Sequence, residues 1–367
     1  MRILHIINGL AMGGAENLLV GLAGTQVMSG NEVTVAPLVC PEYTIIREKL
    51  ESLGVSVKPF KASGSVYSPS FIPKIVNLSK QFDVIHVHLF PSLYWAGLAN
   101  LFNGFSVPFV FTEHSTNNRR RNNRLLHWTD FLVYKYCYNR IIACADKVLD
   151  SFKSFFPSVR HCCTINNGVN VASFTDALPY TKKTLLGINE TDFVIIMVAR
   201  FMSMKRQDTV VEALSKLPDT VHVAFVGGNE YDDGLIRVKK IANDLNLSER
   251  VHFLYTRNDV PKLLKTADAI LMASDYEGLS LSSIEGMAAG KPFIASDVDG
   301  LREVVGGAGV LYKNKDSNEL ARLIFKLYKE KDYYEEIRNQ CLERAKKYDI
   351  NRMVSLYYQV YSEVVKV

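Results

Sequence analysis

Two glutamates with seven residues between them, Glu277 and Glu285, are the residues of this sequence best suited to bind a polar ligand. The residues between them, with Gly278 and Ser282, predict a loop that enters a helix near Ser283. Glu277 would then lie at the end of a strand and Glu285 in the first helical turns, so both would face one cleft. Free backbone N–H groups at a helix N-terminus stabilise phosphate charge. Here these groups would belong to Gly278, Leu279, Ser280 and Leu281.

A second candidate site consists of Arg200 and Lys205, which come after the apolar run at residues 192–199. Parallel sheets bind ligands at the carboxyl ends of their strands, so a diphosphate would fit at this position. Arginine holds phosphate oxygens in a bidentate manner, and lysine supplies a point charge. The alternative interpretation is that both cations are ordinary solvated surface residues.

Near the N-terminus, residues 8–16 read N-G-L-A-M-G-G-A-E, a glycine-bearing turn that opens a helix. Its free N–H groups are suited to hold an anion. The spacing is not G-x-G-x-x-G and lacks a G-K-[ST] ending, so it supports neither a nicotinamide-dependent dehydrogenase nor a P-loop kinase. The alternative is that the glycines only make a tight strand-to-helix turn.

The elements that position these residues follow an alternating strand and helix pattern that starts twice. Such alternation is typical of an α/β fold with doubly wound parallel sheets. The polar, turn-rich stretch at 166–180 predicts the boundary, with an N-terminal domain at 1–170, completed by a helix within 347–367, and a C-terminal domain at 171–346. The expected strands are 2–7, 32–39, 84–87, 108–112 and 140–143, then 192–199, 221–226, 251–254, 269–272 and 292–295, with the first helix at 14–28.

Composition narrows the class of protein further. With 367 residues, 48% hydrophobic and 22% charged, the chain is expected to be a soluble two-domain protein. A net charge of +5 does not by itself indicate nucleic acid as a partner. Six cysteines without a C-x-x-C pair, and no signal peptide, favour a reduced cytoplasmic chain. Residues 87–112 carry no charge, but prolines and glycines interrupt them, which predicts a buried helix and strand and not a membrane span.

The segment E-G-L-S-L-S-S-I-E-G-M-A-A-G-K-P at 277–292 resembles the E-x7-E signature of retaining glycosyltransferases of family 4. The resemblance covers nearly the whole chain. It implies a GT-B fold, in which two Rossmann-like domains face a cleft, the first taking the acceptor and the second the nucleotide-sugar, with a C-terminal helix crossing back. The other matching segments are the opening turn, H-V-H at 86–88, T-E-H-S at 112–115, N-G-V-N at 167–170 and A-R-F-M-S-M-K at 199–205.

The resemblance also implies roles for single residues. Glu277 would contact hydroxyls of the donor sugar as a catalytic residue, and His114 would lie at the reacting sugar. The chain departs from the family pattern at Gly286, where alanine is usual, and at Asp146, where serine is common. The implied binding residues are Glu285 for the ribose, Arg257 and Asn258 for the loop beside the base, and Gly14, Arg200 and Lys205 for the diphosphate.

The resemblance implies transfer of a hexose or N-acetylhexosamine from a nucleotide-sugar, with UDP favoured over GDP, to a glycan acceptor in capsule, O-antigen or exopolysaccharide synthesis. Cations and helix N-termini would neutralise the leaving diphosphate, so no metal or other cofactor is expected. Asp297-Val298-Asp299 is interpreted as a turn after a strand. Two alternatives remain, a non-catalytic sugar-nucleotide-binding protein and a glycoside hydrolase using Glu277 and Glu285. The hydrolase is disfavoured because neighbouring cations lower the pKa of the acid that it needs.

A basic segment in the first domain suggests a second partner. Six basic residues lie between positions 113 and 140, among them Arg119, Arg120, Arg121 and Arg124, and apolar residues follow them. Such a segment would lie at an anionic bilayer carrying a polyprenyl-diphosphate-linked acceptor, at the inner face of the cell membrane. A solvated helix face over a core stripe is the equal alternative. The histidines at 5, 86 and 88 are expected to be satisfied core residues.

Overall fold

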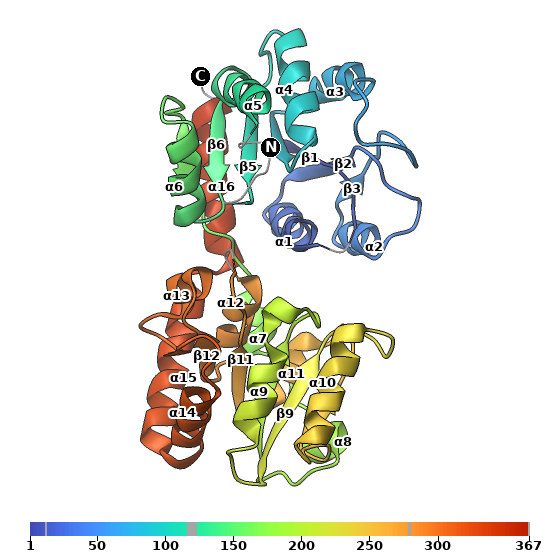
Figure 1. Ribbon diagram of the computed structural model, residues 1–367. Coiled ribbons are helices and arrows are strands. Elements are labelled where there is room, and N and C mark those ends of the chain that lie inside the picture. Colours follow the sequence, from blue (N-terminus) through green and yellow to red (C-terminus); the bar gives the residue numbers. More distant parts are fainter. Residues whose placement is uncertain (12, 116–122, 278–279, 366–367) are drawn as a thin grey trace. The chain divides into compact units, whose positions relative to one another are not determined.

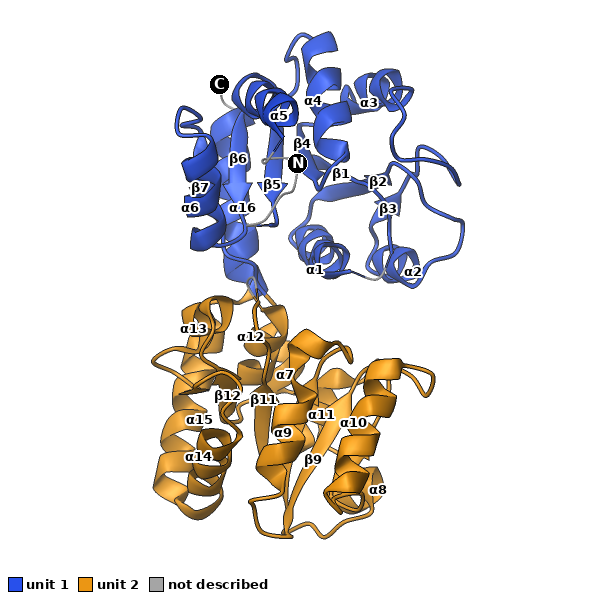
Figure 2. Ribbon diagram, viewed as in Figure 1, with its two compact units in different colours: residues 1–168, 350–367 blue, residues 169–349 orange. Residues whose placement is uncertain are grey.

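The computed structural model describes residues 1–11, 13–115, 123–277 and 280–365 (Figure 1). The chain forms two compact units (Figure 2). The first contains Met1–Gly168 and Ile350–Val367, and the second contains Val169–Asp349. Each unit has one parallel sheet with helices packed on it, which confirms the predicted fold class of two Rossmann-like α/β domains.

The sheet of the first unit has the strand order β3-β2-β1-β4-β5-β6-β7. The order reverses between β1 and β4, and α/β sheets of this kind bind ligands at such a switch point. The strands are β1 Arg2–Ile7, β2 Glu32–Pro37, β3 Ser56–Val57, β4 Val84–His88, β5 Phe109–Glu113, β6 Arg140–Ala143 and β7 Cys162–Thr164. The helices are α1 Gly14–Met28, α2 Ile45–Ser52, α3 Phe71–Ser79, α4 Ser92–Phe102, α5 Arg124–Tyr136, α6 Asp146–Phe155 and α16 Ile350–Val365.

Helix α16 returns to the first unit from the end of the chain and packs with α1 (Figure 1). Its apolar residues recur at helical spacing, so they form one face that must be buried. Met353, Tyr357 and Tyr361 belong to the same buried cluster as Leu19 and Leu22 of α1. In the uncharged stretch at residues 87–112, the structure has helix α4 followed by strand β5, which confirms the expected buried helix and strand.

The second unit has six strands in the order β10-β9-β8-β11-β12-β13, with its switch point between β8 and β11. Strand β8 reads F-V-I-I-M-V and is buried almost throughout, as expected for a parallel strand covered on both faces. The strands are β8 Phe193–Val198, β9 Val221–Val226, β10 Val251–Phe253, β11 Ala269–Met272, β12 Phe293–Ser296 and β13 Val310–Tyr312. The helices are α7 Val171–Thr175, α8 Lys182–Leu186, α9 Gln207–Leu214, α10 Asp233–Asp244, α11 Val260–Thr266, α12 Leu281–Ala288, α13 Asp299–Val305, α14 Ser317–Lys329 and α15 Lys331–Lys346.

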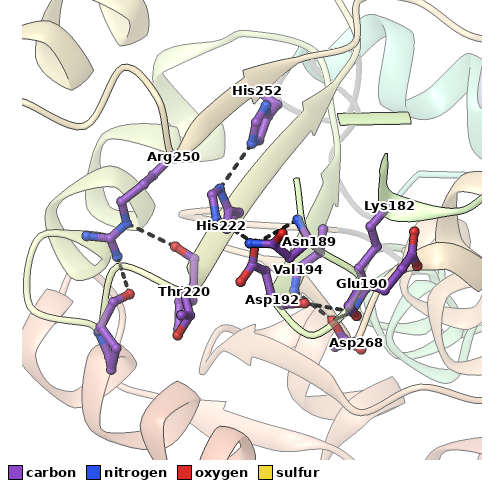
Figure 3. Close-up of polar contacts among 12 residues, drawn as sticks. Lys182, Asn189, Glu190, Asp192, Val194, Thr220, His222, Arg250, His252 and Asp268 are labelled. Carbon is purple, nitrogen blue, oxygen red and sulfur yellow. Dashed lines mark hydrogen bonds and ion pairs between the residues drawn. The ribbon is translucent and has the colours of Figure 1, made fainter. Parts of the chain in front are cut away.

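A polar network holds the amino ends of these strands together (Figure 3). The Asp268 carboxylate, just before β11, accepts from Lys182 Nζ at 2.6 Å and from the backbone N–H of Val194 in β8 at 2.7 Å. His222 of β9 and His252 of β10 are joined by a 3.2 Å hydrogen bond. The charges at this edge serve to fix strand ends, and the other edge of the sheet carries the candidate site.

Candidate functional site

At the carboxyl edge of the second sheet, the loops after β8 and β11 meet at the switch point. Lys205, after β8, forms an ion pair with Glu277, after β11, and the two side chains are only 16% and 15% exposed. Ser274 Oγ donates a hydrogen bond of 2.7 Å to the same Glu277 oxygen. The structure thus brings together a cation and a carboxylate whose contact the sequence did not specify.

A second, neighbouring contact fixes the loop after β8. Arg206 adopts a left-handed φ of 52° and its Nε lies 2.8 and 2.9 Å from the two carboxylate oxygens of Asp275. The backbone N–H of Asp275 donates to Met204 O at 2.7 Å. Burial acts to raise the pKa of Asp275, but hydrogen bonds from Arg206 and Asn314 hold it below its ordinary value. Sequence reasoning missed Asp275, although a carboxylate so soon after a buried strand is a usable signal.

Arg200 lies two residues after the end of β8 and is exposed. Its carbonyl accepts from Gln207 Nε2 and from the Met202 N–H, both at 3.0 Å, so its backbone is held. On the neighbouring strand, Gly227 and Gly228 follow β9 with φ of 135° and 66°. A Cβ on Gly227 would lie 2.3 Å from the carbonyl oxygen of Ala199, so only glycine allows the two loops to pack here. This glycine pair was also missed.

Helix α12 begins at Leu281, two residues before the position that the sequence predicted. Ser280 is its N-cap and accepts from the Ser283 N–H at 3.3 Å. Ser280 is buried and Leu281 half-buried, whereas Gly278 and Leu279 lie outside the described residues. Glu285 is half-buried in the second turn of α12, and its burial raises the pKa of its carboxyl.

Gly286, the departure from the family pattern, has a packing reason in this chain. A Cβ at this position would lie 2.5 Å from Cε2 and 2.6 Å from Cδ2 of Phe293, the first residue of β12. It would also lie 3.0 Å from Cγ2 of Ile270 in β11. The Phe293 ring therefore occupies the space that an alanine methyl would need, and the two residues match each other.

The predicted base-side residues lie in the loop before α11. The Arg257 guanidinium donates to both Asp259 carboxylate oxygens, at 2.8 and 2.5 Å, and Tyr180 OH donates to Asp259 at 2.6 Å. The hydrogen bond with Arg257 holds the pKa of Asp259 well below its usual range, against the effect of burial. Asn258 is exposed. Arg257 is therefore held by a neighbouring carboxylate, and contact with a base stays a prediction for both residues.

In the first unit, the loops after β1 and β4 are tied at the switch point through Asn8. Its Oδ1 accepts from the backbone N–H and the hydroxyl of Ser92, at 3.0 and 2.7 Å. Gly14, the first residue of α1, is exposed, and a Cβ built on it meets no atom within 4 Å. Packing within this unit therefore does not require glycine at position 14, and its predicted contact with a diphosphate remains a prediction.

His114 comes directly after β5 and is half-buried. Its Nε2 lies 3.3 Å from Nδ1 of His88, and burial lowers the pKa of His114 to about 4, so the ring is neutral at pH 7. His5, His86 and His88 are fully or almost fully buried and hydrogen-bonded, as expected for core residues. Arg119, Arg120 and Arg121 lie outside the described residues, and Arg124 is the exposed first residue of α5.

Models of known protein families match both units of the chain. Residues 12–173 match the model described as Glycosyltransferase Family 4, and residues 181–348 match the model described as Glycosyl transferases group 1. Together these matches cover nearly the whole sequence. The chain belongs to the family 4 glycosyltransferases with a GT-B fold.

Individual relatives of this glycosyltransferase agree with that assignment. The chain is 27% identical over 309 residues to an Escherichia coli UDP-Gal:alpha-D-GlcNAc-diphosphoundecaprenol alpha-1,3-galactosyltransferase, covering 76% of this chain and 77% of the relative. It is 25% identical over 303 residues to the N-acetyl-alpha-D-glucosaminyl L-malate synthase of Bacillus anthracis, covering 77% and 75%. The crystal structure of Anabaena HepE in complex with UDP shares the fold, with a TM-score of 0.85, 22% identity, and coverage of 99% of this chain and 100% of that one.

Proposed function

We propose that this glycosyltransferase moves a hexose or an N-acetylhexosamine from a UDP-sugar to a lipid-linked glycan acceptor, with retention of configuration and without a metal ion. The product would belong to a cell-surface polysaccharide. The observation that carries the proposal is the Lys205–Glu277 pair at the β8–β11 switch point, beside the N-terminus of α12. A cation for the diphosphate and a carboxylate for sugar hydroxyls then lie side by side.

The chemistry of the site fits a nucleoside diphosphate as the leaving group. Lys205, Arg200 and the N-terminal N–H groups of α12 supply positive charge for the diphosphate, which accumulates negative charge as the glycosidic bond breaks. Glu285, four residues into the same helix, would accept hydrogen bonds from the two ribose hydroxyls. Positive charge supplied by the chain itself supports the proposal that the transfer needs no metal.

Thermal denaturation with separate millimolar additions of UDP, GDP, ADP and NAD tests the donor proposal. A ligand that binds only the folded state at about 100 times its Kd adds about 2.7 kcal/mol of stability, so the melting temperature rises. We expect the rise with UDP, its loss in Glu285→Ala, and its retention in Glu212→Ala, a control on the exposed side of α9. No rise with any of the nucleotides would contradict a nucleotide-sugar donor.

Turnover separates an enzyme from a sugar-nucleotide-binding protein. Glu277→Ala should abolish transfer from the UDP-sugar, because its carboxylate would contact hydroxyls of the donor sugar. If wild-type protein binds UDP but transfers no sugar to lipid-linked acceptors, the chain is a binding protein and the catalytic proposal is wrong.

The exposed surface of helix α5 supports the proposal that the acceptor is lipid-linked. Leu125, Trp128, Leu132 and Tyr136 recur at helical spacing and are 76%, 62%, 46% and 56% exposed. An exposed apolar stripe beside a basic segment is suited to the surface of an anionic bilayer.

Two relatives have names that specify diphosphoundecaprenol-linked substrates, one from Escherichia coli and one from Campylobacter jejuni. Within the described residues, none of the helices is both long and apolar enough to span a membrane.

Flotation with phosphatidylglycerol-containing vesicles tests this contact. Wild-type protein should float, and both Trp128→Glu and the triple Arg119, Arg120, Arg121 to Glu variant should not. Tyr231→Glu serves as the matched control, because Tyr231 is an 82% exposed aromatic residue of the other unit. Wild-type protein that stays at the bottom of the gradient would end the membrane proposal while leaving the donor proposal intact.

A further inference from the structure

A continuous chain of hydrogen-bonded side chains runs through the first unit from helix α1 to His114. Gln26 Oε1, on α1, lies 2.7 Å from His5 Nε2 on β1. His5 Nδ1 lies 3.1 Å from His88 Nε2 on β4, and His88 Nδ1 lies 3.3 Å from His114 Nε2. Gln26 and His5 are 0% exposed and His88 is 2% exposed, so water does not compete for the contacts among these three residues.

The register of the sheet creates this chain. His5 of β1 is paired with His86 of β4, and His86 and His88 lie two residues apart on the same face of β4. That face is covered by α1 and α16, which supply Gln26 and Tyr361. The polar side chains are therefore enclosed between the sheet and two helices, where each must find a partner within the protein.

The orientation of the Gln26 amide sets the direction of every hydrogen bond in the chain. Its Oε1 only accepts, so His5 must carry its proton on Nε2, and its Nδ1 then accepts. His88 in turn donates from Nε2 and accepts at Nδ1, which requires a proton on Nε2 of His114. The same logic leaves Nδ1 of His114 without a proton, because a neutral imidazole carries only one.

A second branch starts from the other atom of the same amide. Gln26 Nε2 donates to Tyr361 OH at 3.4 Å, and Tyr361 OH can then donate to His86 Nδ1, 2.6 Å away. His86 Nε2, now the protonated nitrogen, lies 2.7 Å from Thr112 Oγ1 as acceptor. Both branches therefore follow from a single amide orientation, and a reversed amide would reverse both.

The three histidines also lie close enough to suggest a metal site, with one nitrogen from each of His5, His86 and His88 within 4.8 Å of one another. In the described part of the chain, however, both ring nitrogens of each are within hydrogen-bonding distance of a protein partner. A metal ion would need at least three of these nitrogens and would break the network. The contacts favour a hydrogen-bond relay.

We propose that Gln26, His5 and His88 are positioning residues that hold His114 in the tautomer with its proton on Nε2, leaving Nδ1 as a hydrogen-bond acceptor. The consequence for transfer rests on the proposed function. An unprotonated Nδ1 accepts from a hydroxyl of the sugar or acceptor, whereas a protonated one would donate to a phosphate oxygen. The buried chain thus selects which kind of group His114 can bind.

Nitrogen-15 NMR of the full chain labelled at histidine tests the assignment directly, because protonated and unprotonated ring nitrogens have distinct chemical shifts. The wild-type spectrum should show the His114 proton on Nε2, with His114→Gln identifying the signals. A proton on Nδ1 of His114 would overturn the proposal. This measurement needs neither activity nor a ligand.

Gln26→Met tests the relay, because it keeps an apolar contact but removes the acceptor on His5. We expect a mixture of His114 tautomers, a kcat lower by between about 10- and 100-fold, and an unchanged melting-temperature rise with UDP. Tyr357→Phe is the matched control, since it removes a buried hydroxyl that lies 3.3 Å from Thr112 on the other branch. It should keep the wild-type tautomer and turnover.

The possible failures are distinguishable. If Gln26→Met keeps a single His114 tautomer and wild-type kcat, the relay has no positioning role and the proposal is wrong. If the wild type neither binds UDP nor transfers sugar, the proposed function fails, and the wild-type tautomer still decides the assignment. If Gln26→Met does not fold, the wild-type spectrum alone decides whether His114 carries its proton on Nε2.

Discussion

Replacing Gly286 by alanine should destabilise the second unit, even though alanine is the better helix-forming residue. The new methyl would lie 2.5 Å from Phe293 Cε2 and 3.0 Å from Ile270 Cγ2. Carbon atoms in contact prefer about 3.5–4.0 Å, so the Phe293 ring or α12 must move by about 1 Å. Both Phe293 and Ile270 are almost fully buried, which leaves little room for such a movement.

Two opposing energies decide the size of the effect. Overpacking a dense core costs about 1–3 kcal/mol, and the gain from glycine to alanine inside a helix is about 0.5–1 kcal/mol. The net loss in unfolding free energy should lie between about 0 and 2.5 kcal/mol, with a central value of about 1 kcal/mol. For a unit of this length, that lowers the melting temperature by about 2–4 °C for each kcal/mol. Because Glu285 is the preceding residue, an outward shift of α12 should also weaken UDP binding.

A double-mutant cycle with Phe293→Leu isolates the contact. Leucine lacks the ring atoms that the methyl would meet, so Gly286→Ala should cost less, or stabilise, in that background. The coupling energy between the two changes should be about 0.5–3 kcal/mol. Urea unfolding followed by far-UV circular dichroism measures all four proteins. Gly286→Ala that is as stable as wild type in the Phe293 background would refute the packing argument.

Three further predictions follow from the described contacts. Lys205→Met should lower kcat/KM by about 100-fold or more, measured by UDP-sugar turnover, because it removes the positive charge that would neutralise the leaving diphosphate and leaves Glu277 without its ion pair. Glu285→Gln should raise the melting temperature of the ligand-free protein at pH 7 and weaken UDP binding. Its folded-state pKa is raised by burial, so its ionised form opposes folding, and the stability gain should disappear below the unfolded pKa of about 4.5. Burial lowers the pKa of His5 and of His114 to about 4, so the unfolded state takes up more protons below about pH 6.5, and the unfolding free energy measured in urea should fall as the pH drops from 6.5 toward 4.

The strands of four or more residues could be predicted from the sequence. The predicted bounds of β1, β6, β9 and β11 coincide with those observed, as do those of α1. Three short strands, β3, β7 and β13, were missed, because runs of two or three residues carry no periodicity that separates them from loops. Their position at or near the edges of the sheets depends on neighbours that are distant in the sequence.

The candidate site was predictable as a set of residue types at strand ends, and less so as a set of contacts. The sequence indicated that Lys205 and Glu277 each follow a strand, but their ion pair depends on β8 and β11 being neighbours in the sheet. Gly286 was recognised as unusual, yet its reason lies in Phe293, which a spacing argument does not connect to it. The helix bounds shifted by two residues because Ser280, and not a later serine, caps α12.

The two units hold their candidate residues by opposite electrostatic means. In the second unit, paired charges at the carboxyl edge remain partly accessible, so Lys205 can exchange part of its contact with Glu277 for a phosphate oxygen. In the first unit, burial keeps His5 and His114 neutral at pH 7, and the proposed order of protons follows the orientation of one amide. High salt should weaken binding of a nucleoside diphosphate, because screening acts on the exposed charge of Arg200 and on the charges of the ligand. The His114 tautomer should not change with salt, since no net charge maintains it.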